Sequence, residues 1–346
     1  MAAELKPFRV GRLTIDFPVV LAALAGISDL TYRLICRRRG APYCTTEAML
    51  DREMLVDGKL RRRLVRITPE DHPLAGQIIG NDPRVMAQAA AVLCQMGFDV
   101  VDLNFACPVR RVITRRRGGH LMRHPQQAVE IIRAVAAVVE GPLTVKLRRS
   151  FLESDKAGET FFRIAEAAFD AGAAAVCLHA RSVEAKYAGP ADWEFLAKVK
   201  RHFAGCTIIG SGDVHRPADA LAMLEQTAVD AVAVARGAIG NPWFFQQVRD
   251  LLAGGPLFKP TLAQQRELML QQLADVTEIY KPQKLAGIMR KFGVKYARLH
   301  PAPAKVRSAF AGVKRLDQWH AVLDEYYSET FSTQAPAATP SEAPQG

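Results

Sequence analysis

Short apolar segments recur along most of the chain, and stretches with helical periodicity separate them. Most of these segments are uninterrupted rather than alternating, which is typical of parallel strands that are covered on both faces. We therefore expect eight strands, at residues 18–24, 43–49, 74–79, 100–105, 143–147, 174–179, 206–210 and 231–235.

Helix signals lie between these strands. Asp82 supplies an N-cap, Pro83 follows at the first helical position, and Gly97 ends the helix predicted at residues 84–96. Strands that alternate with helices favour a (β/α)8 TIM barrel, an α/β fold of roughly 250 residues. An open doubly wound sheet is the alternative, but no G-x-G-x-x-G turn follows the first strand. Further helices are expected at residues 126–139, 193–202 and 218–225.

The pattern changes after the Gly-Gly-Pro sequence at residues 254–256. Helical periodicity alone follows, at residues 261–280, 285–299, 302–311 and 316–327. This pattern predicts a C-terminal all-helical domain rich in Arg and Lys. The predicted organisation is a lead-in at residues 1–17, a barrel at 18–253, a helical domain at 260–330 and a tail at 331–346. The tail consists largely of Ala, Pro, Ser and Thr, a composition that predicts disorder.

Composition narrows the class of protein. Hydrophobic residues make up 49% of the chain, yet no apolar segment approaches the roughly 20 residues of a membrane helix. The N-terminal sequence lacks the apolar stretch of a signal peptide. We therefore expect a cytoplasmic protein without membrane contact, and a monomer. The six cysteines show no CxxC pair or regular spacing, so neither a disulfide framework nor a metal site is predicted.

The charge balance indicates a polyanionic partner. The chain has 46 basic and 35 acidic residues, a net charge of +11. Arginines cluster at residues 37–39, 61–66 and 110–117. Such clusters on an ordinary background composition favour binding to a polyanion.

Residues 100–109 (VVDLNFACPV) contain the strongest candidate site. An apolar strand leads directly to Asn104 and Cys107, and Pro108 ends it because proline has no N–H for the ladder. In a barrel the C-terminal ends of all strands converge on one mouth, where the chemistry takes place. A buried apolar cysteine without a chemical role is the common alternative.

The ends of the other strands carry residues that fit a cofactor. Lys146 lies within an apolar strand, and a buried lysine needs an anionic partner. The glycine-rich turns after the last two strands occupy the usual phosphate site of the fold, where Arg236 adds a guanidinium fork. Together with the small residues after the first strand, they indicate a phosphorylated planar cofactor, and FMN fits. Taken singly, Gln77 and His179 are also typical of satisfied core residues.

Several motifs together resemble the tRNA-dihydrouridine synthases, especially the bacterial B-type subgroup, over residues 10–319. The motifs are LAALAGISDLTYR, GQIIGNDP, VDLNFACPVRRV, LTVKLR, LHARSVEAKYAGPADW, IIGSGDV and VARGAIGNPW. The resemblance implies a barrel that holds FMN and a helical domain that binds RNA. It also implies reduction of the C5=C6 bond of uridines in tRNA to 5,6-dihydrouridine, with NADPH or NADH as electron donor.

The resemblance also implies roles for individual residues. Cys107 is expected to give a proton to C5 while flavin N5 delivers hydride to C6, and a thiol with a pKa near 8.5 is mostly protonated at neutral pH. Asn104, Arg148 and Arg181 are expected to contact the substrate base, which must be flipped out of the RNA stack. The expected FMN contacts are Ala23, Leu24, Ala25, Gln77, Lys146, His179, Ser211, Gly212, Asp213, Ala235 and Arg236.

The chain departs from the family pattern at several positions. Residues 116–120 read Arg-Arg-Gly-Gly-His where the family has small residues, and Phe292 and Lys295 replace the usual His and Trp of the helical domain. We hypothesise a divergent member whose RNA target differs from the usual tRNA position. The alternatives are an oxidoreductase acting on another RNA such as ribosomal RNA, one acting on a small pyrimidine, and a non-catalytic RNA-binding factor. Further departures are Ala23 for Pro, Ala106 for Gly, Ser211 for Asn and Ala235 for Gly.

Overall fold

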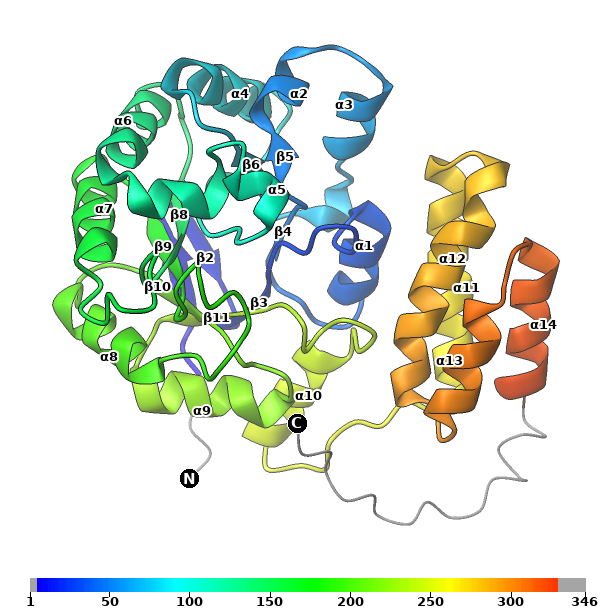
Figure 1. The fold of residues 1–346 in the computed structure, drawn as a ribbon. Helices are drawn as coiled ribbons and strands as arrows, with labels where there is room; N and C mark the ends of the chain where they lie inside the picture. The colour runs from blue at the N-terminus through cyan, green and yellow to red at the C-terminus, as the bar shows by residue number, and fades with distance from the viewer. Residues whose placement is uncertain (1–4, 329–346) are drawn as a thin grey trace. The chain divides into compact units, whose positions relative to one another are not determined.

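A computed structural model describes residues 5–328, so the tail predicted to be disordered lies outside the described residues. The described chain forms two compact units (Figure 1). The first unit comprises residues 5–238 and 243–256, and the second comprises residues 239–242 and 257–328.

The first unit is a closed barrel of parallel strands, which confirms the predicted fold class. Its sheet has the strand order β4-β3-β11-β10-β9-β8-β7-β6-β5, and direct pairing of β4 with β6 closes the barrel. The predicted second strand is split into β4 and β5, both of which pair with β6. The strands are β3 (Val19–Leu21), β4 (Cys44–Thr45), β5 (Met49–Leu50), β6 (Leu74–Ile79), β7 (Val100–Asn104), β8 (Leu143–Arg148), β9 (Ala175–His179), β10 (Ile208–Ser211) and β11 (Ala231–Val234).

Helices cover the outside of these strands (Figure 1). The predicted cap is confirmed at α4, where the Asp82 side chain accepts the N–H groups of Arg84 and Val85. The helix predicted at residues 193–202 is α8 with the same bounds. The helices of this unit are α1 (Leu30–Arg37), α2 (Asp51–Leu55), α3 (Lys59–Leu64), α4 (Pro83–Gln95), α5 (Arg110–Ile113), α6 (Pro125–Ala136), α7 (Glu159–Asp170), α8 (Trp193–His202), α9 (Pro217–Thr227) and α10 (Phe244–Leu252), with 3-10 turns η1 (Pro69–Asp71) and η2 (Gly118–Arg123).

The predicted lead-in contains an antiparallel hairpin of β1 (Phe8–Val10) and β2 (Leu13–Ile15). Its side chains Phe8, Val10 and Ile15 are buried in one cluster with residues such as Val100 and Ala175, which begin barrel strands. The hairpin therefore fills the N-terminal end of the barrel. The C-terminal ends of the strands are left for the site.

The second unit is helical, with α11 (Leu262–Ile279), α12 (Pro282–Tyr296), η3 (Ala297–Leu299), α13 (Pro303–Ala311) and α14 (Leu316–Tyr326). The Thr261 side chain caps α11 in a capping box with Gln264. Phe292, Phe310 and Trp319 are fully buried in its core. None of the helices within residues 5–328 is long and apolar enough to cross a membrane.

Candidate active site

Asn104 and Cys107 are joined by a turn at the end of β7. The Asn104 Oδ1 atom accepts the backbone N–H groups of Ala106 at 3.1 Å and Cys107 at 3.0 Å. An asparagine three residues before the cysteine therefore fixes the backbone that presents the thiol. Burial raises the pKa of the half-buried Cys107 thiol, although a hydrogen bond from Val109 and the charge of Arg148 oppose the rise. The thiol is thus protonated near neutral pH, the state that a proton donor requires.

Behind this turn, buried side chains form a hydrogen-bonded chain. Asn104 Nδ2 donates to Gln77 Oε1 at 2.7 Å, and Gln77 Nε2 donates to Asp102 Oδ2 at 2.6 Å. Thr144 Oγ1 donates to Asp102 Oδ1 at 2.6 Å. Because a carboxylate only accepts hydrogen bonds, Asp102 makes Gln77 turn its Nε2 atom toward it. The Gln77 oxygen then faces Asn104 and orients that amide in turn. Sequence reasoning missed Asp102, although an acidic residue inside the apolar segment VVDLN is a signal that could have found it.

Lys146 lies next to this chain, where burial raises the pKa of Asp102 and the charge of Lys146 opposes the rise. Its Nζ donates to Cys177 Sγ at 3.3 Å, and no ion pair to Lys146 occurs within the described residues. With Ala23, Gln77 and Asp102 among its neighbours, it lines a cavity of about 30 Å³ inside the barrel. Asp102 therefore interacts with this lysine electrostatically, but no carboxylate within residues 5–328 forms a direct ion pair with it.

His179 is surrounded by positive charge. Burial lowers the pKa of His179 to about 2, and the charges of Arg148, Lys146, Arg181 and Arg236 act in the same direction. The imidazole is therefore neutral, and its Nε2 atom lies 3.4 Å from Arg181 Nη1, which suits an acceptor role. A concentration of cations around a neutral histidine is an environment for an anionic ligand.

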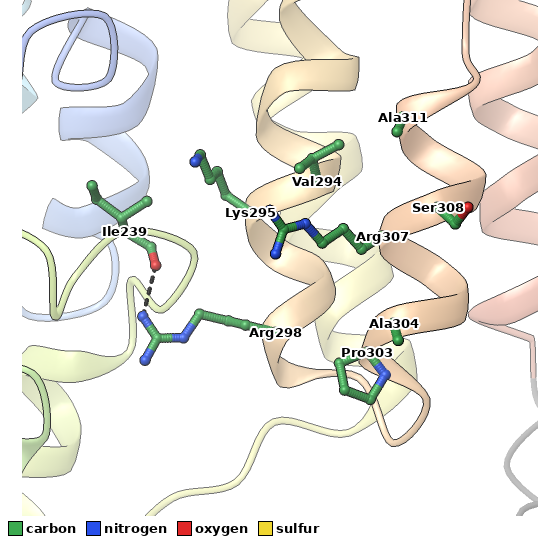
Figure 2. A pocket seen from close by; sticks show the side chains of 9 residues that line it. All are labelled: Ile239, Val294, Lys295, Arg298, Pro303, Ala304, Arg307, Ser308 and Ala311. Carbon is green, nitrogen blue, oxygen red and sulfur yellow. Dashed lines mark hydrogen bonds between the residues drawn. The ribbon is translucent and has the colours of Figure 1, made fainter. Parts of the chain in front are cut away.

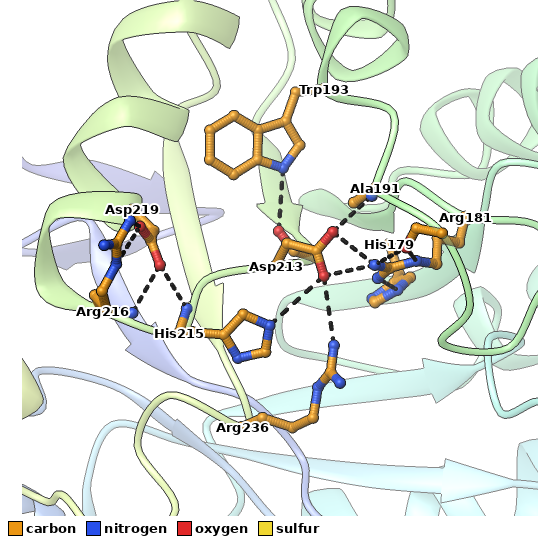
Figure 3. A network of polar contacts seen from close by, with 11 residues as sticks. His179, Arg181, Ala191, Trp193, Asp213, His215, Arg216, Asp219 and Arg236 are labelled. Atoms are coloured by element: carbon orange, nitrogen blue, oxygen red, sulfur yellow. Dashed lines mark hydrogen bonds and ion pairs between the residues drawn. The ribbon is translucent and has the colours of Figure 1, made fainter. Parts of the chain in front are cut away.

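Asp213 orients the cations on this side of the mouth (Figure 3). Its carboxylate accepts Arg181 Nη2 at 2.6 Å and the Ala191 N–H at 2.6 Å, and Arg236 Nη2 lies 3.4 Å away. Burial raises the pKa of Asp213, but the hydrogen bonds from Arg181 and Ala191 outweigh it and lower the pKa overall. As a charged acceptor, the Asp213 side chain positions the arginines rather than binding a phosphate itself.

Arg148 and Arg181 use most of their donors inside the protein. Arg148 donates to the carbonyl oxygens of Ala106 at 2.9 Å, Ser182 at 2.7 Å and Lys186 at 2.7 Å. Arg181 donates to Gly189 O at 3.0 Å as well as to Asp213. Arg148 therefore ties the Cys107 turn to the loop after β9.

The strand register brings the predicted residues to one end of the barrel. Asn104 pairs with Lys146, Arg148 with His179, and His179 with Ser211 across neighbouring strands. The remaining predicted residues directly follow strands at the same end: Ala23, Leu24 and Ala25 after β3, Gly212 and Asp213 after β10, and Ala235 and Arg236 after β11. The structure thus assembles the predicted set around one mouth, while the function of each residue stays a prediction.

The unusual loop after Cys107 packs closely on the cysteine. The Gly119 N–H donates to the Cys107 carbonyl at 3.0 Å, and a Cβ on Gly118 would lie 3.0 Å from the Cys107 Cβ. Gly118 also has a φ of +57°, which favours glycine. Gly118 is thus favoured by the close approach to Cys107, and a Cβ on Gly119 would lie 2.8 Å from Val183 Cγ2 as well as 3.0 Å from the Cys107 carbonyl oxygen.

The helical unit contains a basic groove between α12 and α13 (Figure 2). Arg298 Nη1 donates to Ile239 O at 2.9 Å, and both residues line the groove. The groove has a volume of about 660 Å³ and includes Lys295, one of the departures from the family pattern. Its lining residues are Ile239, Val294, Lys295, Arg298, Pro303, Ala304, Arg307, Ser308 and Ala311.

Comparison with known proteins gives consistent matches. The sequence profile of the family "Dihydrouridine synthase (Dus)" matches residues 20–332. The chain is 30% identical to tRNA-dihydrouridine synthase B of Pseudomonas aeruginosa over 323 residues, covering 93% of this chain and 96% of that protein. It is 34% identical to a probable tRNA-dihydrouridine synthase of Treponema pallidum over 301 residues, covering 84% of this chain and 88% of that protein.

Solved structures show the same barrel in more distant proteins. A 2-naphthoyl-CoA reductase complex superposes with a TM-score of 0.57 at 16% identity, covering 73% of this chain and 52% of that chain. A morphinone reductase variant in complex with tetrahydroNAD gives a TM-score of 0.53 at 18% identity, covering 74% of this chain and 92% of that chain. At these identities the likeness concerns the fold alone.

Proposed function

The chain belongs to the dihydrouridine synthase family, and from that premise we propose that it reduces the C5=C6 bond of specific uridines in tRNA to 5,6-dihydrouridine. The proposed electron donor is NADPH or NADH, and the proposed site of action is the cytoplasm. The observation that carries the proposal is the position of the Cys107 thiol, held at the barrel mouth by Asn104 next to a cationic cluster.

The residues at the mouth fit FMN. Lys146 forms no direct ion pair within residues 5–328, and of the four cations near the neutral His179, Arg181 and Arg236 pair with Asp213. An anionic cofactor fits the remaining positive charge. We assign the phosphate to Arg236 and the turn of Ser211 and Gly212. The isoalloxazine ring is assigned to the small residues 23–25, with Gln77, Lys146 and His179 at its polar edge. When bound, FMN supplies the hydride for uracil C6.

Cys107 supplies the other hydrogen atom. Its Sγ–H proton passes to C5 of the uracil, so the hydride and the proton together saturate the double bond. Asn104 Nδ2 keeps one hydrogen without a partner among the described residues, and we propose that this N–H binds a uracil carbonyl. Arg148 holds the Cys107 turn in place and presents its remaining Nη2 group to the base.

The RNA is proposed to bind through its phosphates. The groove of α12 and α13 carries Lys295 and Arg307, which suit contacts to a sugar–phosphate backbone. The target uridine must be flipped into the mouth because its C5 and C6 atoms are otherwise stacked. A small free pyrimidine has no phosphate backbone for this groove to bind, so the groove favours an RNA substrate.

The first test uses the purified protein and tRNA from cells that lack this gene. Cys107→Ala is expected to stay yellow and to oxidise NADPH at the flavin, yet to form dihydrouridine about 10²-fold or more slowly, as expected for loss of a general acid. Cys94→Ala, at a half-buried position on α4, is the matched control and should keep full activity. Mass spectrometry of digested RNA measures the product.

The outcomes separate the candidate functions. Unchanged product formation by Cys107→Ala would exclude the proton-donor role. Product in ribosomal RNA instead of tRNA would change the substrate class. A colourless protein that binds RNA without reducing it would support the non-catalytic alternative.

A further inference from the structure

The loop that departs from the family pattern carries a compact basic cluster, formed by Arg116, His120, Arg123 and His124. The rings of His120 and His124 are stacked, with centroids 4.5 Å apart and planes at 27°. His120 is half-buried, whereas the other three side chains are exposed. Arg123 lies over the ring of Phe151, with its Cζ 3.8 Å from the centroid, so packing holds its guanidinium in place.

No carboxylate within residues 5–328 forms an ion pair with this cluster, although α7, which packs against η2, carries Glu159 and Glu166. The η2 turn that carries His120 packs against α5, α6, α7 and β8. Burial lowers the pKa of His120, and the charges of His124, Arg116 and Arg123 lower it further. Within residues 5–328 none of the four side chains forms an ion pair. The first turn of α6 has no acidic residue, and Glu130 further along accepts a hydrogen bond from Gln126 at 3.3 Å.

The cluster is adjacent to the reacting thiol in the chain and in space. His120 follows Gly119, whose N–H donates to the Cys107 carbonyl at 3.0 Å. A nucleotide flipped into the mouth brings along the phosphodiesters on its two sides. One of these must therefore pass the rim of the mouth near Cys107.

We propose that Arg116, His120, Arg123 and His124 form a binding subsite for an RNA phosphodiester next to the target uridine, and that RNA binding there takes up a proton. This inference rests on the proposed function. Imidazolium and guanidinium groups both donate charge-assisted hydrogen bonds to phosphate oxygens. In the free protein the two arginines oppose protonation of His120, and a bound phosphate removes that penalty.

The sign of the pH dependence follows from this linkage. Burial and the neighbouring cations lower the pKa of His120 in the free protein, and a bound phosphate opposes this lowering, so protonation of His120 and RNA binding favour each other. The affinity for RNA therefore increases as the pH falls through the pKa of the complex. Each proton taken up gives at most a tenfold change in Kd per pH unit.

The experiment measures binding of a fluorescent pool of unmodified tRNA transcripts to the flavin-loaded protein between pH 6 and pH 8, at several salt concentrations. Wild-type protein is expected to bind about tenfold or more tightly at pH 6 than at pH 8. The salt dependence should also be steeper at pH 6, by roughly 0.7 to 0.9 for each extra phosphate contact.

The double variant His120→Gln/His124→Gln keeps polar side chains but cannot take up protons. The affinity of this variant for tRNA is expected to differ much less between pH 6 and pH 8 than that of the wild-type protein. His202→Gln is the matched control, because His202 is an exposed histidine on α8 that pairs with Glu166 at 3.3 Å. This control should behave as wild type. The proposal is overturned if the double variant follows the wild-type curve at every pH.

Further variants test the same subsite. If the double variant fails to fold, the single variant His120→Gln carries the same test and should lose most of the pH dependence. Arg116→Gln should weaken binding at both pH values by losing one counterion-releasing contact. A higher KM for NADPH with RNA binding unchanged would assign the cluster to the reductant and refute the proposal.

The readout is independent of the proposed reaction. Absence of dihydrouridine in every RNA tested would refute the proposed function, whereas the pH-linked binding difference concerns the subsite alone. Conversely, a double variant that forms dihydrouridine and binds RNA with wild-type pH dependence refutes the subsite and leaves the proposed function in place.

Discussion

At the scale of residues, the site depends on the orientation of side-chain amides. Asn104 accepts two backbone N–H groups of the Cys107 turn, and it is held in that orientation by Gln77. Gln77 is held in turn by Asp102, which accepts its Nε2 atom. The orientation of the cysteine turn therefore depends on a carboxylate two residues before the asparagine.

Asp102→Asn tests this dependence. The introduced amide has one acceptor oxygen where the carboxylate has two, so either the Thr144 hydroxyl must turn from donor to acceptor or the Gln77 amide must turn, and the hydrogen bonds are no longer strengthened by a charge. We expect a loss of about 1–3 kcal/mol in the free energy of unfolding and at least a tenfold lower rate of dihydrouridine formation. Urea unfolding and the product assay measure both.

The matched control for Asp102→Asn is Thr144→Val, which removes the other hydrogen bond to the same carboxylate but leaves the Gln77 amide in place. Thr144→Val should lower the free energy of unfolding but reduce the rate of dihydrouridine formation less than Asp102→Asn does. Equal rates of dihydrouridine formation by the two variants would show that the orientation of the Gln77 amide does not control the position of the Cys107 thiol.

At the scale of elements, the loop between β7 and α6 adapts to Cys107 through two glycines. Gly118 has a left-handed backbone, and a Cβ there would approach the Cys107 Cβ to 3.0 Å. Arg115 and Arg116 are exposed and Arg117 is half-buried, while the glycines make the close contact. The loop that departs from the family pattern is therefore closely packed against Cys107 at its glycines.

Gly118→Ala is expected to displace the thiol. A left-handed alanine costs about 1–2 kcal/mol in stability, and the contact with Cys107 should also lower the rate of dihydrouridine formation severalfold. Gly97→Ala, at a φ of +86° with nothing within 4 Å of the new Cβ, is the control. It should lose comparable stability at full activity. If both variants keep full activity, the contact with Gly118 is not needed for thiol placement.

At the scale of the whole molecule, the two compact units carry different parts of the proposed function. The barrel gathers the polar groups for chemistry, and the helical unit contains the basic groove. Net charge alone could not assign these roles, because arginine clusters occur along the barrel as well.

Lys295→Ala/Arg307→Ala tests the groove of the helical unit. Loss of two cations should weaken tRNA binding and reduce the slope of log K against log salt by about 1.4 to 1.8. Flavin content should not change. Lys284→Ala, an exposed lysine on α12 outside the groove, is the control. A double variant with an unaltered salt slope would assign RNA binding to other surfaces.

The sequence by itself determined the barrel, most strand and helix positions and the strand ends at which the candidate residues lie. It could do so because strand and helix periodicities are local, and because a parallel barrel brings all C-terminal strand ends together. Tertiary structure alone decided the split of the second strand, the hairpin that fills the barrel base and the chain of contacts from Asp102 to Cys107. Those features depend on contacts between residues far apart in the chain, such as Gln77 with Asp102, which no local pattern specifies.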